Sequence, residues 1–149
     1  MDISVKKRLM ACALGRLEPD FVLKNARIAD VFSEKLFRAD IAVKDGYIAG
    51  VGHYSAAREK DMSRKTVVPG FMDAHTHLES SMTAPSILAP KLLEHGTTAV
   101  IADPHEIANV CGLEGVRYLM EDSARTPLDV FFALPSCVPL SPSDHNGAV

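Results

Sequence analysis

The sequence predicts an α/β protein built in two parts, residues 1–66 and 67–149. Between Phe21 and Gly52, apolar side chains recur at every second residue, which is typical of short strands with one buried face. After Val67, short and nearly continuous apolar segments alternate with helical patterns, which indicates βαβ units around a parallel sheet. A hydrophobic content of 47% with 23% charged residues fits a chain that buries a core.

The first part begins with a predicted amphipathic helix over residues 3–17, where apolar residues, Cys12 among them, recur at steps of three and four. Two-residue alternation then predicts strands over residues 21–25, 26–32, 37–43 and 47–51. Between the last two, Asp45 and Gly46 predict a hairpin with a type I′ turn, because Gly readily takes the positive φ that this turn requires. Residues 54–65 are polar and are expected to link the two parts.

The most distinctive stretch is residues 67–82, Val-Val-Pro-Gly-Phe-Met-Asp-Ala-His-Thr-His-Leu-Glu-Ser-Ser-Met. If residues 71–79 form a buried strand, its alternation places four polar side chains on one face: Asp73, His75, His77 and Glu79. Imidazole and carboxylate are the usual ligands of Zn, Mn or Fe at hydrolytic centres. We therefore interpret His75 and His77 as metal ligands. The alternative is a pair of solvated or core histidines.

The second part continues as strand, helix, strand, helix, strand, which makes two successive βαβ units. Thr83 is the expected N-cap of the first helix, and Gly96 fits the left-handed position after its end. The next strand covers residues 97–102. Glycines interrupt the segment that follows it, so the second helix is expected to start near Leu113. The last strand covers residues 128–134.

A second polar block, Asp103-Pro104-His105-Glu106, follows the strand over residues 97–102. Asp as the N-cap, Pro at the first helical position and Glu at the third make a capping box. The same residues also lie at the C-terminal end of a parallel strand, where active sites are built. The spacing alone leaves both interpretations open.

Residues 69–77, Pro-Gly-Phe-Met-Asp-Ala-His-Thr-His, resemble the first barrel strand of the amidohydrolase superfamily, which comprises metal-dependent hydrolases built on a (β/α)8 barrel. Four blocks in the same order narrow this resemblance to the adenine deaminases within that superfamily: residues 77–82, 96–100, 102–110 and 135–139. The resemblance implies that residues 67–149 are the first three strands of a TIM-like barrel. It also implies that residues 1–66 are an N-terminal helix with part of a flanking β-sandwich.

The resemblance further implies hydrolysis of adenine to hypoxanthine and ammonia, as in purine salvage. It implies a divalent cation, Mn(II) or Fe(II), in a binuclear centre with His75 and His77 among its ligands. Further residues are expected to contact the substrate or to support the metal ligands: Asp73, Glu79, Ser80, Asp103, His105, Glu106 and Ser136. A (β/α)8 barrel takes about 250 residues. The chain is therefore expected to be an N-terminal fragment, inactive alone, with its catalytic residues beyond residue 149.

Composition and charge indicate which partners and which compartment to expect. A net charge of −3 gives no basic footprint for nucleic acid. No segment approaches the roughly 18 apolar residues that span a bilayer, and three separated cysteines without a Cys-x-x-Cys motif favour a reducing compartment. We expect a cytoplasmic protein that acts on a small molecule and is a homodimer when complete. The alternatives are another amidohydrolase acting on a cyclic amide, or a non-catalytic truncated remnant.

Overall fold

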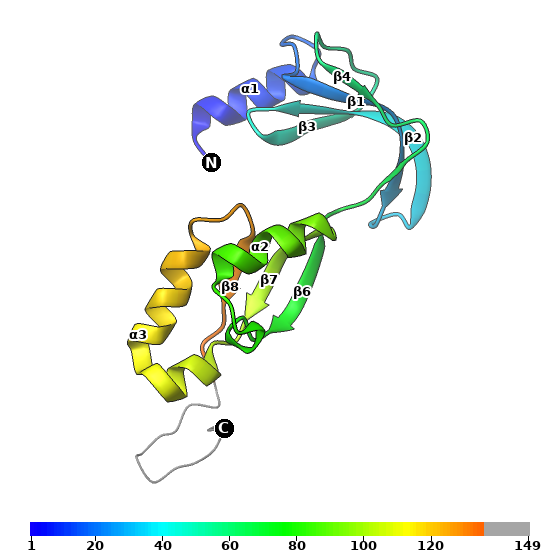
Figure 1. Cartoon of the computed structure of the whole chain (residues 1–149). Helices are drawn as coiled ribbons and strands as arrows, with labels where there is room; N and C mark the ends of the chain where they lie inside the picture. The colour runs from blue at the N-terminus through cyan, green and yellow to red at the C-terminus, as the bar shows by residue number, and fades with distance from the viewer. Residues whose placement is uncertain (136–149) are drawn as a thin grey trace. The chain divides into compact units, whose positions relative to one another are not determined.

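The computed structural model describes residues 1–135 and divides into two compact units, Met1–Pro69 and a second unit that begins at Gly70 (Figure 1). The mixed α/β class predicted from the sequence is confirmed. The elements are, in chain order, α1 (Ile3–Ala13), β1 (Phe21–Asp30), β2 (Lys35–Lys44), β3 (Tyr47–Gly52), β4 (Glu59–Asp61), β5 (Thr66–Val67), β6 (Phe71–Thr76), the 3₁₀ turn η1 (Glu79–Ser81), α2 (Pro85–Glu94), β7 (Thr97–Ala102), α3 (His105–Ser123) and β8 (Asp129–Phe132). Among these described helices, none is long and apolar enough to cross a membrane.

The first unit is a five-stranded sheet with α1 packed against β2 and β3. Strands β1, β2 and β3 form an antiparallel meander, and β4 and β5 both pair with β1 in parallel. The two strands predicted over residues 21–32 form the single strand β1, which is irregular near Asn25, a residue with φ of 58°. The predicted polar link was partly wrong, because residues 59–61 form β4.

The turn between β2 and β3 has the predicted geometry. Asp45 and Gly46 have φ angles of 51° and 78°, and Lys44 pairs with Tyr47 across the turn. Two positive φ angles are what a type I′ turn requires, so this sequence prediction is confirmed.

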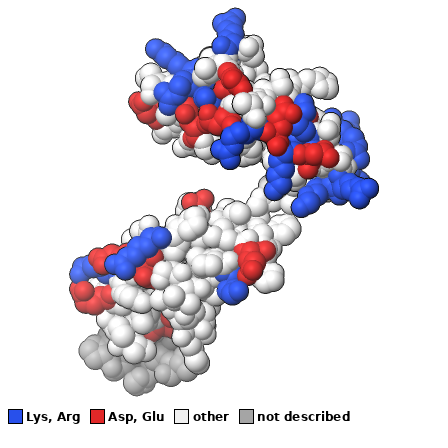
Figure 2. All heavy atoms as spheres, turned by 45° about the horizontal axis from the view of Figure 1, so that its top comes forward, with Lys and Arg blue, Asp and Glu red and all other residues white. Residues whose placement is uncertain are grey.

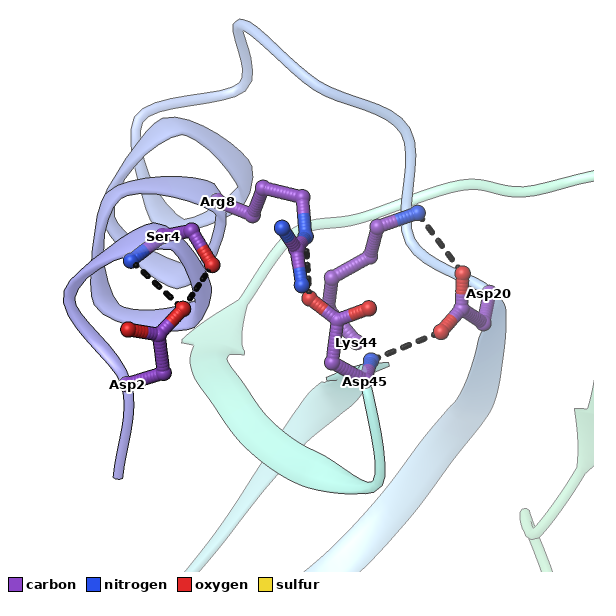
Figure 3. Close-up of polar contacts among 6 residues, drawn as sticks. All are labelled: Asp2, Ser4, Arg8, Asp20, Lys44 and Asp45. Carbon is purple, nitrogen blue, oxygen red and sulfur yellow. Dashed lines mark hydrogen bonds and ion pairs between the residues drawn. The ribbon is translucent and has the colours of Figure 1, made fainter.

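Charged side chains connect α1 to this turn, as Figure 3 shows. Asp2 caps the helix by accepting a hydrogen bond from the Ser4 backbone N–H at 3.2 Å. From the next turn of the helix, Arg8 Nε donates to Asp45 Oδ2 at 2.7 Å. The helix ends at Ala13, earlier than predicted, and Gly15 follows with φ of 68°. A glycine with positive φ is a common helix stop.

A buried carboxylate, Asp40, joins three segments of the first unit. It is 5% exposed and accepts hydrogen bonds from Lys24 Nζ at 2.6 Å, Asn25 N at 2.9 Å and Tyr54 N at 3.1 Å. Burial raises the pKa of Asp40, but the three hydrogen bonds and the Lys24 charge outweigh burial and hold the pKa at about 2, below its ordinary 3.8. The carboxylate is therefore ionised at neutral pH and links β1, β2 and the segment after β3.

The second unit contains a three-stranded parallel sheet in the order β6-β7-β8, with α2 packed against β7 (Figure 1). Its core is a cluster of five buried side chains, from the segment after β6, from α2, from β7 and from the residue before β8: Leu78, Ala89, Val100, Ala102 and Leu128. On the face drawn in Figure 2, charged side chains crowd over the first unit and are sparse over the second. Exposed apolar residues of the second unit include Val110 and Leu113, each 79% exposed.

Strand β6 departs from the prediction in two ways. It ends at Thr76, so Glu79 is not on its face and belongs to η1 instead. The strand was also predicted to be buried, whereas Phe71 and Met72 are 59% and 58% exposed. Strand β6 is an edge strand that pairs only with β7 among the described strands, and few described residues cover these side chains.

The helices of the second unit begin where side chains from other elements cap them. The N-cap of α2 is Ala84, not the predicted Thr83, and it offers no side-chain cap. Asp122 of α3 accepts from Ser86 N at 2.7 Å instead, and this hydrogen bond lowers the pKa of Asp122. Gly96 follows α2 with φ of 91°, as predicted. Helix α3 is divided by Gly112, whose φ of 60° and ψ of −153° are not helical, and its second part begins near Leu113 as predicted. The shorter helical part that begins at His105 was not predicted.

The Asp40 cluster predicts a pH dependence of stability. The folded pKa lies below the unfolded value, so the contribution is complete above about pH 4 and is lost as the pH falls toward about 2. At about 1.4 kcal/mol per pKa unit, the contribution is about 2 kcal/mol. Asp40→Asn should remove it and flatten the unfolding free energy between pH 4 and pH 2 in urea titrations. The exposed Glu34→Gln is the control. An Asp40→Asn protein as stable as the parent at pH 7 contradicts this account.

Candidate metal centre

The polar residues singled out in the sequence gather at the C-terminal ends of β6 and β7. His75 lies on β6 and His77 just after it, while Asp103 follows β7 and His105 begins α3. Parallel pairing brings these two strand ends together. In the second unit, Asp103 N donates to Thr76 O at 2.9 Å, which extends the strand pairing up to the polar residues.

Two imidazoles converge in this cluster. His75 Nε2 and His77 Nε2 are 3.1 Å apart, and the two rings meet edge to face. His77 Nδ1 lies 2.8 Å from the backbone oxygen of Asp103. A carbonyl oxygen only accepts, so the proton of His77 belongs on Nδ1 and the lone pair on Nε2. His77 therefore presents an unprotonated ring nitrogen toward His75.

Two overlapping groups of side chains could hold a metal ion. The first is His75, His77 and Asp103, and the second is His77, His105 and Glu106. Within each group, the candidate ligand atoms all lie within 4.8 Å of one another. His77 belongs to both groups, so the two candidate sites overlap at this residue.

Three buried atoms in this region have no hydrogen-bond partner among the described residues: Glu79 Oε2, Asp103 Oδ1 and His105 Nδ1. The nearest charged neighbour of His105 Nδ1 is Asp103 Oδ2 at 3.5 Å. A buried polar atom without a partner costs about 1–3 kcal/mol. Their clustering beside two converging imidazoles fits a site that binds a cation.

Glu79 and Ser80 attach η1 to the first turn of α3. Glu79 Oε1 accepts from Ile107 N at 3.1 Å, and Ser80 Oγ donates to Glu106 Oε2 at 2.7 Å. The N-cap position of α3 is Pro104, which offers no side-chain cap. The capping box with Asp103 as N-cap is therefore wrong, because the cap comes from Glu79 on a different element.

The remaining predicted residues lie away from the cluster or outside the described residues. Asp73 is exposed, accepts from His75 N at 3.1 Å and belongs to neither metal-binding group. Ser136 lies outside the described residues. The sequence placed Asp73 and His75 on one strand face, but only His75 reaches the cluster.

Comparisons with known proteins bear on the same segment. Residues 66–148 match the sequence model of the Amidohydrolase family. The chain is 53% identical over 148 residues to adenine deaminase 2 of Desulfotalea psychrophila, which covers 99% of this chain and 26% of that protein. It is 50% identical over 137 residues to adenine deaminase of Clostridium acetobutylicum, which covers 92% of this chain and 24% of that protein. The chain thus spans about a quarter of the length of these curated relatives.

One solved structure is similar to this chain in fold. It belongs to an uncharacterized protein that is 23% identical to this chain, with a TM-score of 0.50. The similarity covers 75% of this chain and 31% of that chain.

The Glu79 cap yields a stability prediction. Glu79→Ala should lower the unfolding free energy by about 1 kcal/mol, as loss of an N-cap does, and should speed hydrogen exchange at the Ile107 amide. Glu79→Gln keeps an acceptor oxygen and should be affected less. Glu94→Ala is the control, because Glu94 is exposed and its ion pair is with Lys91 in the same helix. Unchanged exchange at Ile107 in Glu79→Ala contradicts the cap.

Proposed function

The chain belongs to the amidohydrolase family, and we propose that it is the segment of an adenine deaminase that supplies the first metal ligands. The observation that carries this proposal is the convergence of His75 Nε2 and His77 Nε2 at 3.1 Å beside the end of β7. Identities of 53% and 50% to adenine deaminases over nearly the whole chain support it. The whole protein would hydrolyse adenine to hypoxanthine and ammonia.

The proposal gives each unit a place in a larger fold. The described sheet has the order β6-β7-β8, and in this proposal its strands are the first three of a (β/α)8 barrel, with α2 and α3 as the first crossover helices. The first unit contributes an N-terminal helix and part of a flanking β-sandwich. Barrel enzymes build their active sites at the C-terminal ends of the strands. The metal-binding groups lie at those ends of β6 and β7.

The side chains present fit a divalent cation. Two neutral imidazoles and nearby carboxylates suit Mn(II) and Fe(II), and the unpartnered Asp103 Oδ1 is an acceptor that a cation would satisfy. A divalent cation supplies Lewis acidity when bound, which lowers the pKa of water and provides a nucleophile at neutral pH. His75 and His77 hold the ion in this proposal. A second ion of a binuclear centre needs further ligands from beyond the described residues.

In this proposal, the other polar residues of the cluster either orient the metal ligands or contact the substrate. The Asp103 carbonyl fixes the tautomer and ring orientation of His77 through its 2.8 Å contact. Ser80 Oγ holds Glu106 through Oε2, and in this proposal the carboxylate accepts a hydrogen bond from an amino group of the purine.

His75→Ala and His77→Ala should each lose more than about 100-fold in Mn(II) affinity, because removal of even a hydrogen-bond partner of a ligand costs about 10–100-fold. Isothermal titration of Mn(II) into chelator-treated protein measures the affinity. His53→Ala is the matched control, since His53 is exposed, lies in the first unit and belongs to neither group. Parent-like Mn(II) affinity in both histidine variants would sink the proposed metal site.

Substrate choice separates adenine deamination from hydrolysis of a cyclic amide. The complete Mn(II)-loaded protein should release ammonia from adenine and leave dihydroorotate intact, while residues 1–149 alone should show no turnover. Ammonia release and the loss of dihydroorotate, followed by chromatography, measure the two reactions. Turnover of dihydroorotate without turnover of adenine would assign the chain to a different amidohydrolase.

A further inference from the structure

Asp103 lies beside the two converging histidines, on the neighbouring strand. Its backbone N–H donates to Thr76 O at 2.9 Å, and its backbone oxygen is 2.8 Å from His77 Nδ1. These two contacts, one on each side of the residue, hold the backbone of Asp103 against the end of β6. Its side chain is 14% exposed, and its ligand atom lies within 4.8 Å of those of His75 and His77.

The geometry points to Asp103 as a third ligand of the ion held by His75 and His77, which rests on the metal site proposed above. The observation that carries this inference is the state of the carboxylate. Oδ1 is buried and has no hydrogen-bond partner among the described residues, while Oδ2 is 3.5 Å from His105 Nδ1. A cation on Oδ1 satisfies the orphaned oxygen and leaves Oδ2 facing His105.

The neighbouring carboxylates are less suited to this role. Asp73 is exposed and accepts a hydrogen bond from His75 N. Glu79 has a buried oxygen without a partner too, but it belongs to neither group of possible ligands. Glu106 accepts from Ser80 Oγ and is grouped with His77 and His105, not with His75. Among the described carboxylates, only Asp103 shares a metal-binding group with both His75 and His77.

The inference has a chemical consequence. Two histidines and one carboxylate with open positions beside them form a ligand set suited to Fe(II) and similar divalent ions. All three ligands lie on or directly after β6 and β7, within the described residues. One ion can therefore be held by β6 and β7 alone, without a ligand from any later strand.

Cysteine substitution and Co(II) test this directly. A thiolate that coordinates Co(II) gives a charge-transfer absorption band in the near ultraviolet, whereas a thiol that does not bind the metal gives none. We expect Asp103→Cys to gain such a band over the parent protein at one equivalent of Co(II). Asp73→Cys, which places a thiol next to His75 but outside the group, should gain none. Asp103→Asn should bind Co(II) roughly 100-fold more weakly.

The possible outcomes are distinct. If the parent binds Co(II), Asp103→Cys shows no band and Asp103→Asn binds as tightly as the parent, the inference about Asp103 is overturned and the histidine site stands. If the parent itself binds no Co(II), both the site and this inference fall. Circular dichroism of Asp103→Asn, which keeps the shape of the side chain, separates a lost ligand from a lost fold.

Discussion

The candidate metal centre depends on the parallel pairing of β6 with β7. That pairing aligns the two strand ends, so that residues 26 positions apart in the sequence, His77 and Asp103, meet through a 2.8 Å contact. The same contact orients the His77 ring. The hydrogen bond from Asp103 N–H to Thr76 O holds the Asp103 backbone against the end of β6. Without this pairing, His75 at the end of β6 and His77 just after it would lack the Asp103 carboxylate beside them.

The helices of the second unit secure this arrangement by exchanging caps. Neither α2 nor α3 has a side-chain cap at its own N-cap position. Asp122 near the end of α3 binds Ser86 N at the start of α2, and Glu79 binds Ile107 N at the start of α3. Carboxylates at helix N-termini also complement the helix dipole. The position of His105 and Glu106 is thus set by residues outside their own helix.

Local sequence predicted the features that depend on one or two residues. Asp45-Gly46 specified its turn through the φ angles that the turn requires, and Gly96 specified a helix end. Residues two apart near a strand end lie close together, which accounts for the contact between the imidazoles of His75 and His77.

Features that depend on distant contacts could not be predicted in this way. The Glu79 cap joins residues 28 positions apart, and no local pattern marks it. Gly112 correctly marked the interruption of α3, but without that cap in view the helical part that begins at His105 was missed. The exposure of β6 depends on which neighbours cover the strand, whereas its apolar residues alone predicted burial.

The most direct measurement is an anomalous diffraction map from crystals of the protein grown with Mn(II). We predict a strong peak at the ends of β6 and β7, about 2 Å from His75 Nε2, His77 Nε2 and a carboxylate oxygen of Asp103. Manganese found only elsewhere, with the two imidazoles bonded to each other or to solvent, would contradict the account.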